Sequence, residues 1–346
     1  MPSSVAGKLS VNRRTFLGAA GAAATMLALP SIGRAQGAAA KVRIATLPSI
    51  ILFPTYVAQD LGVFKDNGVD VELVVGRGGS ELIQLMVSGA VDVANAGVEH
   101  ILKLRETGLD AKVIAVQEKR YITELVVHNK HKDKVKTVKD LSGMTIGISG
   151  IGSGSHVCAR YILRNAGLDP DLDVSFVAVG SPATQVDAFK NGQVEALMAY
   201  DPAQSILKYD AKIAYPVWSG VAGDPPALFQ DFAMEALGAK AEWIAKNKAA
   251  AMGVAKANMQ AIDLILKKDP RVIDVYQKMF PGVARAVLER SIEEHLGAFS
   301  PVLTEQGIKN VSEYGKFAGV TTRPFTMAET VPEGFSEIWS NWKSPV

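Results

Sequence analysis

The sequence contains one cysteine, Cys158, among 346 residues. A single cysteine excludes an intramolecular disulfide, and it argues against a zinc site built on thiolates. The five histidines show no spacing that is typical of metal ligands. We therefore expect no metal and no other cofactor, and we interpret Cys158 as a small buried side chain on a helix.

An excess of charge of one sign is also missing. The chain has 37 Lys and Arg against 35 Asp and Glu, and four of the basic residues fall within residues 1–35, which contain no acid. The rest of the chain therefore carries slightly more acidic than basic residues. Because nucleic-acid binding needs a concentrated basic face, we expect no nucleic-acid partner.

The N-terminus has the features of an export signal over residues 1–35. Arg13 and Arg14 stand shortly before Phe16, and an uncharged stretch follows that runs to Gly33. Paired arginines in this position are typical of a twin-arginine signal. Small residues around Ala35 predict cleavage there.

Two alternatives to a cleaved twin-arginine signal remain open. The segment also fits an ordinary secretory signal. Its uncharged stretch has about the length of a membrane span, so a retained anchor is the other alternative. Each of these places the working part of the chain outside the cytoplasm, and we expect a periplasmic protein.

From Val42 to Tyr200, short β-rich runs alternate with helical stretches. One example is the predicted helix Tyr56–Lys65, which stands between two predicted strands. This rhythm predicts an α/β fold with a largely parallel sheet. It restarts at Glu124, which indicates two lobes. From Ala241 onward the pattern is helical, with a long helix predicted over Trp243–Lys267 and a final one over Ala328–Trp339. We assign residues 41–123 and 233–346 to lobe one and residues 124–232 to lobe two.

Four turns rich in glycine and small polar residues each follow a predicted strand and precede a predicted helix. Open α/β sheets bind ligands at the carboxyl ends of their strands, and a helix start offers free N–H groups to an anion. Arg77 is a candidate clamp for an acidic group. The turns are Gly76–Ser80, Asn95–Glu99, Ser149–Ser155 and Gly180–Thr184, and their candidate ligand-binding residues are Arg77, Gly97, Glu99, Ser153, Ser155, Ser181 and Thr184.

Aromatic residues near the same turns suit a small organic ligand. Phe53 and Tyr56 follow the first strand, Tyr121 lies at the junction of the two units, and Tyr200 and Asp201 close the last strand of the second unit. The alternative for the aromatic residues after the first strand is a place in the core. Asp201 and Glu99 either pair with an amine or cap helices.

Longer stretches of the chain, between Val42 and Phe317, resemble the NMT1/THI5-like family. These are the periplasmic solute-binding proteins of ABC importers for nitrate, sulfonates, taurine and thiamine precursors. The stretches are Tyr56–Lys65 with Gly68–Glu72, Leu85–Ala94 with Gly97, Val138–Ser149, Gly152–Ser155 with Leu163–Leu168, and Ala188–Leu197.

The resemblance implies a periplasmic-binding-protein type II fold, with a cleft between two lobes and the C-terminal helices on lobe one. Crossing strands are implied near Glu118–Val126 and Asp224–Met234. A small organic ligand with an acidic group is implied in the cleft, such as a sulfonate, a taurine-like zwitterion or an aromatic acid. A monomer that closes on this ligand and docks on an inner-membrane ABC permease is implied as well.

Two other functions must be weighed against import. A periplasmic sensor subunit would bind a ligand in the same way and report it to a receptor. An enzyme of the same fold makes the thiamine pyrimidine, but it needs a pyridoxal phosphate lysine, a reactive histidine and a cysteine-rich sequence. The single cysteine argues against that enzyme, and we expect a protein without catalytic activity.

Overall fold

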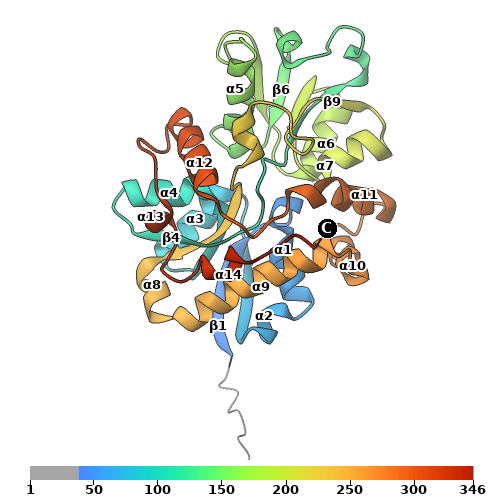
Figure 1. Ribbon diagram of the computed structural model, residues 1–346. Helices are drawn as coiled ribbons and strands as arrows, with labels where there is room; N and C mark the ends of the chain where they lie inside the picture. The colour runs from blue at the N-terminus through green and yellow to red at the C-terminus, as the bar shows by residue number, and fades with distance from the viewer. Residues whose placement is uncertain (1–38, 346) are drawn as a thin grey trace, which may run out of the picture. The chain divides into compact units, whose positions relative to one another are not determined.

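The computed structural model describes residues 39–345, which fold around two separate five-stranded sheets (Figure 1). The predicted signal over residues 1–35 lies outside the described residues. Within residues 39–345 no helix is long and apolar enough to cross a bilayer. We call the first sheet with its helices lobe one and the second sheet with its helices lobe two.

The sheet of lobe one has the strand order β2-β1-β3-β10-β4. Strands β1, β2 and β3 pair in parallel, whereas β10 runs antiparallel to both of its neighbours. Buried β-branched residues such as Val42, Ile44 and Val93 fit the pleated surface of these strands. The strands are β1 (Ala40–Thr46), β2 (Val69–Val75), β3 (Val93–Gly97), β4 (Ala111–Val116) and β10 (Glu235–Lys240).

The sheet of lobe two repeats this plan with the order β7-β6-β8-β5-β9. Here β5 is the reversed strand, antiparallel to β8 and β9. Along β8 the side chains alternate, because Ala196 and Met198 join the core shared with lobe one while Leu197 and Ala199 join a second core. The strands are β5 (Glu124–His128), β6 (Thr145–Ile148), β7 (Ser175–Ala178), β8 (Ala196–Ala199) and β9 (Ala214–Ser219).

The reversed strand of each sheet is the one that arrives from the other lobe. The chain leaves lobe one through residues 117–123 into β5 and returns through residues 220–234 into β10. Glu124 pairs with the last residue of β8, and Glu235 pairs with the last residue of β3. The carboxyl ends of the other strands in each sheet therefore adjoin the two crossing segments.

Helices follow the strands in both lobes. In lobe one they begin after β1, β2 and β3, and in lobe two after β6, β7 and β8. The helices of lobe one are α1 (Phe53–Asp60), α2 (Val63–Asp66), α3 (Gly79–Ser88) and α4 (Val98–Glu106). Those of lobe two are α5 (Gly154–Asn165), α6 (Pro182–Lys190), α7 (Ala203–Ser205) and the π-helical turn η4 (Ile206–Asp210).

The C-terminal helices pack mainly on lobe one. Helix α9 contacts α1, α2 and β4, α10 contacts α1, and α12 contacts α4. Helix α11 contacts α10 and also α7 and η4 of lobe two. The helices are α8 (Ala241–Lys246), α9 (Lys248–Leu266), α10 (Pro270–Met279), α11 (Arg285–His295), α12 (Glu305–Phe317), α13 (Met327–Thr330) and α14 (Glu337–Ser340).

Three predicted helices are each divided in two. Gly62 adopts a left-handed conformation (φ 78°), which ends α1 and starts α2 inside the predicted helix Tyr56–Lys65. Asn247 leaves the helical region between α8 and α9. The predicted final helix Ala328–Trp339 consists of α13 and α14, separated at Pro332, which lacks an N–H to continue a helix.

Candidate functional site

All four turns that the sequence singles out lie at the carboxyl ends of strands. Two connect β2 to α3 and β3 to α4 in lobe one, and two connect β6 to α5 and β7 to α6 in lobe two. The turns of each lobe share one edge of that lobe's sheet, next to the crossing segments.

Three serine hydroxyls form a closed triangle at the start of α5. Ser149 Oγ lies 2.9 Å from Ser153 Oγ and 2.8 Å from Ser155 Oγ, and the last two lie 3.0 Å apart. Ser153 also caps the helix by accepting a bond from His156 N, and Ser155 accepts one from Ser149 N at 2.9 Å. These polar groups satisfy one another, at a helix end that favours negative charge.

Tyr121 fastens the same helix start to the crossing segments. Its hydroxyl donates to Gly154 O at 2.9 Å and lies 3.4 Å from the hydroxyl of Tyr314 on α12. Its ring packs against Phe229 at 4.9 Å between centroids. A side chain at Gly220 would collide with the carbonyl oxygen of Tyr121, so glycine permits the close approach of the two crossing segments.

Gly97 and Glu99 act together at the start of α4. A Cβ at Gly97 would lie 2.7 Å from both carboxylate oxygens of Glu99, so the absence of a side chain allows the carboxylate to fold back over the strand end. Glu99 is 9% exposed, and His100 Nε2 lies 3.8 Å from it. Burial of the neighbouring Glu235, and after it the charge of Glu99, raises the pKa of Glu235 well above the ordinary value.

Arg77, Ser181 and Thr184 lie at the surface. The Arg77 side chain is 92% exposed, and its Nε pairs with Glu81 at 3.1 Å, one helical turn onward. Thr184 Oγ1 donates to Ser181 O at 3.0 Å, at the start of α6. The structure therefore gives these polar groups local partners within their own turns.

The two aromatic residues after β1 have different surroundings. Phe53 is fully buried and packs on Tyr276 of α10, with ring centroids 4.8 Å apart, as the core alternative would have it. Tyr56 is partly exposed, and burial of its hydroxyl raises its pKa to about 12.

Tyr200 and Asp201, after β8, also differ from one another. Burial raises the pKa of Tyr200 to about 12. Asp201 is fully buried, and its carboxylate accepts bonds from Ser205 N, Ser205 Oγ and Ser291 Oγ at 2.7–2.8 Å. These donors saturate most of the carboxylate, which caps the start of the helical segment and holds α11.

Buried polar residues that sequence reasoning missed gather at the edge of the sheet of lobe one. Asn95 Nδ2 and Gln117 Nε2 both donate to Thr55 Oγ1 at 2.8 Å. Several buried atoms there have no partner of normal hydrogen-bond geometry among the described residues: Thr46 Oγ1, Tyr56 OH, Asn95 Oδ1 and both carboxyl oxygens of Glu118. Looser contacts join Thr46 to Tyr56 and the backbone of Glu235 to Glu118, so Asn95 Oδ1 is the clearest case.

Glu118 is the most unusual of these residues. It is fully buried in the first crossing segment, and burial, followed by the charge of Glu235, raises the pKa of its carboxyl well above the ordinary value. A strongly perturbed carboxyl at a junction of lobes is typical of a functional position. In the sequence, the only feature that points to a functional role for Glu118 is its position directly after a buried strand.

Arg120 is the second charged residue that the sequence reading passed over. Its Nε is buried and has no hydrogen-bond partner among residues 39–345, and its guanidinium pairs with no carboxylate there. It lies in the same crossing segment as Tyr121. In contrast to Arg77, Arg120 has no carboxylate partner within residues 39–345, and a carboxylate or another acidic group is what a guanidinium pairs with best.

No group of three or more His, Cys, Asp or Glu residues within 39–345 is arranged to hold a metal ion. Cys158 is fully buried, and burial raises the pKa of its thiol well above the ordinary value. The polar groups at the sheet edges are thus suited to hydrogen bonding and charge pairing with a small molecule.

Two α/β lobes that meet at their strand ends, each with one strand received from the other, have the fold of periplasmic binding proteins. Solved proteins of this class for sulfonates and for nitrate share it. The pattern of the NMT1-like family matches residues 35–274, and the chain belongs to that family.

Individual relatives agree with this placement. The chain is 24% identical over 272 residues to the binding protein YtlA of Bacillus subtilis strain 168, across 77% of this chain and 80% of that protein. A solved protein of Bordetella bronchiseptica RB50 is 25% identical, with a TM-score of 0.73 over 88% of this chain and 98% of that chain. The alkanesulfonate-binding protein SsuA of Xanthomonas axonopodis pv. citri, solved with bound MOPS, shares the fold at 20% identity, with a TM-score of 0.68 over 85% and 98% of the two chains.

Proposed function

We propose that the chain is an extracytoplasmic solute-binding protein that captures a small organic anion and delivers it to an ABC import permease. The observation that carries this proposal is the set of buried, unpartnered polar atoms at the edge of the lobe-one sheet. Buried polar groups without partners cost free energy, and a ligand that pairs with them recovers it. Family membership and the likeness to sulfonate-binding and nitrate-binding proteins support the same function.

The charged end of the ligand binds near Arg120 and the start of α5. Arg120 has no ion-pair partner among the described residues, and the start of α5 supplies N–H groups and the hydroxyls of Ser153 and Ser155. Arg77 is a weaker candidate, because Glu81 already neutralises it at the surface. The distinction between these arginines is a testable refinement of the site.

The opposite end of the ligand presents hydrogen-bond donors to lobe one. The atoms there without partners of normal geometry include the acceptor Asn95 Oδ1 and the carboxyl group of Glu118, which keeps acceptor capacity when it is protonated, with Glu99 nearby at the start of α4. An amine or amide group satisfies such acceptors. A taurine-like zwitterion fits both ends, and Tyr56, Tyr121 and Tyr200 would contact an aromatic acid.

A ligand screen tests the proposal. Thermal unfolding is measured with taurine, MOPS, other alkanesulfonates, aromatic carboxylates, nitrate and pyrimidines. A ligand at 100 times its dissociation constant should stabilise the protein by about 2.7 kcal/mol. Unchanged unfolding with every anion, or chemical conversion of a bound molecule, would contradict the proposal.

Export of the chain is part of the same proposal. The segment with Arg13 and Arg14 directs the chain to the periplasm, and cleavage occurs near Ala35. N-terminal sequencing of the exported protein measures the cleavage position. Replacement of both arginines by lysine should stop export, and normal export of that variant would indicate the general secretory route.

A further inference from the structure

Helix α11 lies between the two lobes. It follows α10 in the chain and contacts that helix, and it also contacts α7 and η4 of lobe two (Figure 1). Helix α10 itself is fixed to lobe one, because Tyr276 packs on Phe53 and Lys278 Nζ pairs with Asp60 at 2.7 Å. The contacts on the two sides of α11 decide which lobe it moves with.

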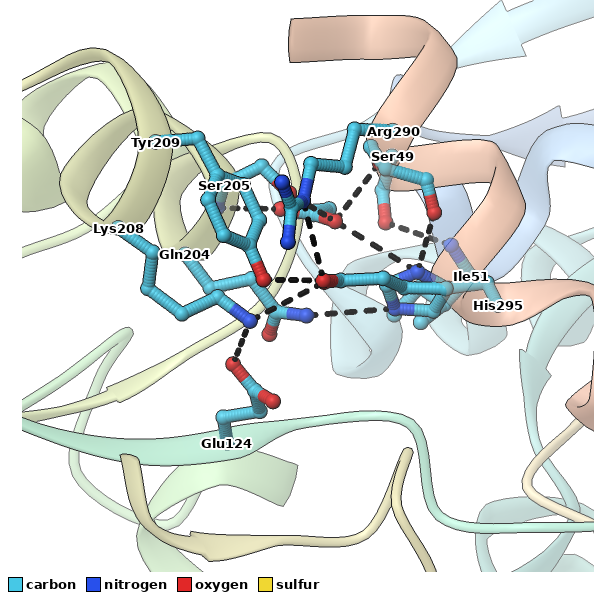
Figure 2. A network of polar contacts seen from close by, with 12 residues as sticks. Ser49, Ile51, Glu124, Gln204, Ser205, Lys208, Tyr209, Arg290 and His295 are labelled. Carbon is cyan, nitrogen blue, oxygen red and sulfur yellow. Dashed lines mark hydrogen bonds and ion pairs between the residues drawn. The ribbon is translucent and has the colours of Figure 1, made fainter. Parts of the chain in front are cut away.

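A buried group of charges joins α11 to lobe two. The Lys208 side chain is 7% exposed, and its Nζ lies 2.6 Å from Glu124 and 3.1 Å from Glu294 of α11. Tyr209 donates to Glu294, and the Arg290 guanidinium lies 3.8 Å from the centre of the Tyr209 ring (Figure 2). Burial alone would lower the pKa of Lys208, but the attraction of the two glutamates is greater, and the pKa is raised.

A second buried group extends this contact. Ser291 Oγ of α11 donates to Asp201 at 2.7 Å, and both residues are fully buried. His295 Nδ1 lies 2.7 Å from Ser291 O and therefore donates to it, which leaves Nε2 to accept from Gln204 at 3.4 Å (Figure 2). Toward lobe one, Ser291 Oγ lies 3.2 Å from the hydroxyl of Tyr276.

The remaining polar contacts of α11 toward α9 and α10 are exposed. Arg285 pairs with Asp274 at 2.7 Å and Lys268 with Glu293 at 3.0 Å, and the four side chains are 47–69% exposed. Exposed pairs of this kind hold elements together weakly, because water screens them. The buried pair on the other side is much more costly to break.

An open pocket lies between α11 and the helices α9 and α10, beside the direct contact of α10 with α11. It has a volume of about 260 Å³, and its apolar lining comes from all three helices. Apolar contacts have no preferred direction, so helices can slide past one another on them, whereas hydrogen bonds and ion pairs fix a position. The apolar lining residues include Ile265, Ile273, Ile292 and Leu296.

We infer that α11 moves as part of lobe two, although its neighbours in the chain belong to lobe one. The surface between α11 and α9–α10 is the sliding interface of the molecule. Where the lobes close on a ligand, which rests on the proposed function, α11 slides over this interface. The attachment of α11 to lobe two is itself independent of any ligand.

Hydrogen exchange of the ligand-free protein, resolved by peptide, tests the attachment. Lys208→Met removes the charge that joins α11 to lobe two, and Tyr276→Phe removes the buried hydroxyl on the lobe-one side. Lys268→Met is the matched control, since it removes a lysine from the neighbouring glutamate of the same helix. We expect Lys208→Met to raise exchange in α11 and in residues 203–210 together by about ten-fold or more. The other two variants should change it by less than about three-fold.

The inference would be overturned if Lys208→Met raised exchange in residues 203–210 but left exchange in α11 unchanged. It would also be overturned if Tyr276→Phe raised exchange in α11 as much as Lys208→Met does. If Lys208→Met does not fold, Glu294→Gln replaces it in the test. The glutamine has the size of the glutamate and keeps an oxygen that accepts the hydrogen bond from Tyr209. This variant should give the same pattern with a smaller rise of roughly five-fold, which still exceeds the limit of about three-fold set for the two control variants. Because no ligand is added, failure here is separate from failure of the ligand screen.

Discussion

The two sheets share one topology, but their carboxyl edges differ in how polar groups are paired. At the edge of lobe two, Ser149, Ser153 and Ser155 bond to one another and cap α5. At the edge of lobe one, Asn95 Oδ1 and the Glu118 carboxylate are buried without partners of normal geometry among the described residues. The serine turn of lobe two is satisfied as it stands, although Gln185 Oε1 and Gln204 Oε1 elsewhere in that lobe are also buried without a partner of normal geometry among residues 39–345. We propose that a ligand completes the polar groups at the edge of lobe one.

This difference indicates how binding energy divides between the lobes. A ligand at the serine triangle must replace existing hydrogen bonds, so the net gain for each is small. A ligand at the edge of lobe one relieves a desolvation cost that the protein already bears. The crossing segment 117–123 adds Arg120, which has no ion-pair partner there. We therefore expect the crossing segment to dominate affinity.

The largest effect is predicted for Arg120→Ala. It removes a charge-assisted contact of roughly 1.5–3 kcal/mol, so affinity should fall by about ten- to a hundred-fold. Calorimetry with the hit of the ligand screen measures this. Arg77→Ala is the matched control and should change affinity by less than about two-fold, since Glu81 already pairs with Arg77 at the surface. A larger loss of affinity for Arg77→Ala than for Arg120→Ala would indicate that the anion binds at the β2–α3 turn.

The sequence was sufficient for the features that depend on local pattern. The strand-turn-helix rhythm predicted two α/β lobes and placed all four turns at strand ends, as the structure has them. It could not show where helices break, because a single Gly62 or Asn247 is also found inside continuous helices. The backbone conformations of these two residues, which the sequence does not specify, end α1 and α8.

Contacts between distant residues lay beyond the sequence. Asp201 and Phe53 look like site residues by position, but their partners Ser291 and Tyr276 lie on the C-terminal helices, 90 residues away in the case of Ser291. Glu118 was overlooked because a glutamate is ordinarily exposed, and its neighbours Glu235 and Phe299 come from distant parts of the chain.

Glu118→Gln should stabilise the ligand-free protein at neutral pH. The pKa of Glu118 is raised in the folded protein, so its contribution to stability is fully present below the unfolded value near 4.5 and is lost as pH rises toward the folded pKa. The glutamine variant has no such loss. We expect it to gain roughly 1–3 kcal/mol at pH 7.5 and almost nothing at pH 4.5.

Denaturant unfolding at the two pH values measures this difference. Glu242→Gln is the control, because its side chain on α8 is 69% exposed and should show no comparable gain. A destabilised Glu118→Gln protein at pH 7.5 would mean that the carboxylate is ionised and paired. The proposed contrast between the two edges would then fail.

The smallest effect is predicted for Ser155→Ala in the serine triangle at the start of α5. Ser155 is 7% exposed and bonds to Ser149 N, Ser149 Oγ and Ser153 Oγ, so the ligand gains one neutral donor from it. Such a bond contributes about 0.5–1.5 kcal/mol, and affinity should fall by roughly two- to twelve-fold, less than for Arg120→Ala. Calorimetry on both variants gives the comparison, with Ser181→Ala at the exposed start of α6 as the control. If Ser155→Ala lowers affinity as much as Arg120→Ala does, the anion binds to lobe two. The ligand would then replace the hydrogen bonds among the three serine hydroxyls with bonds to itself.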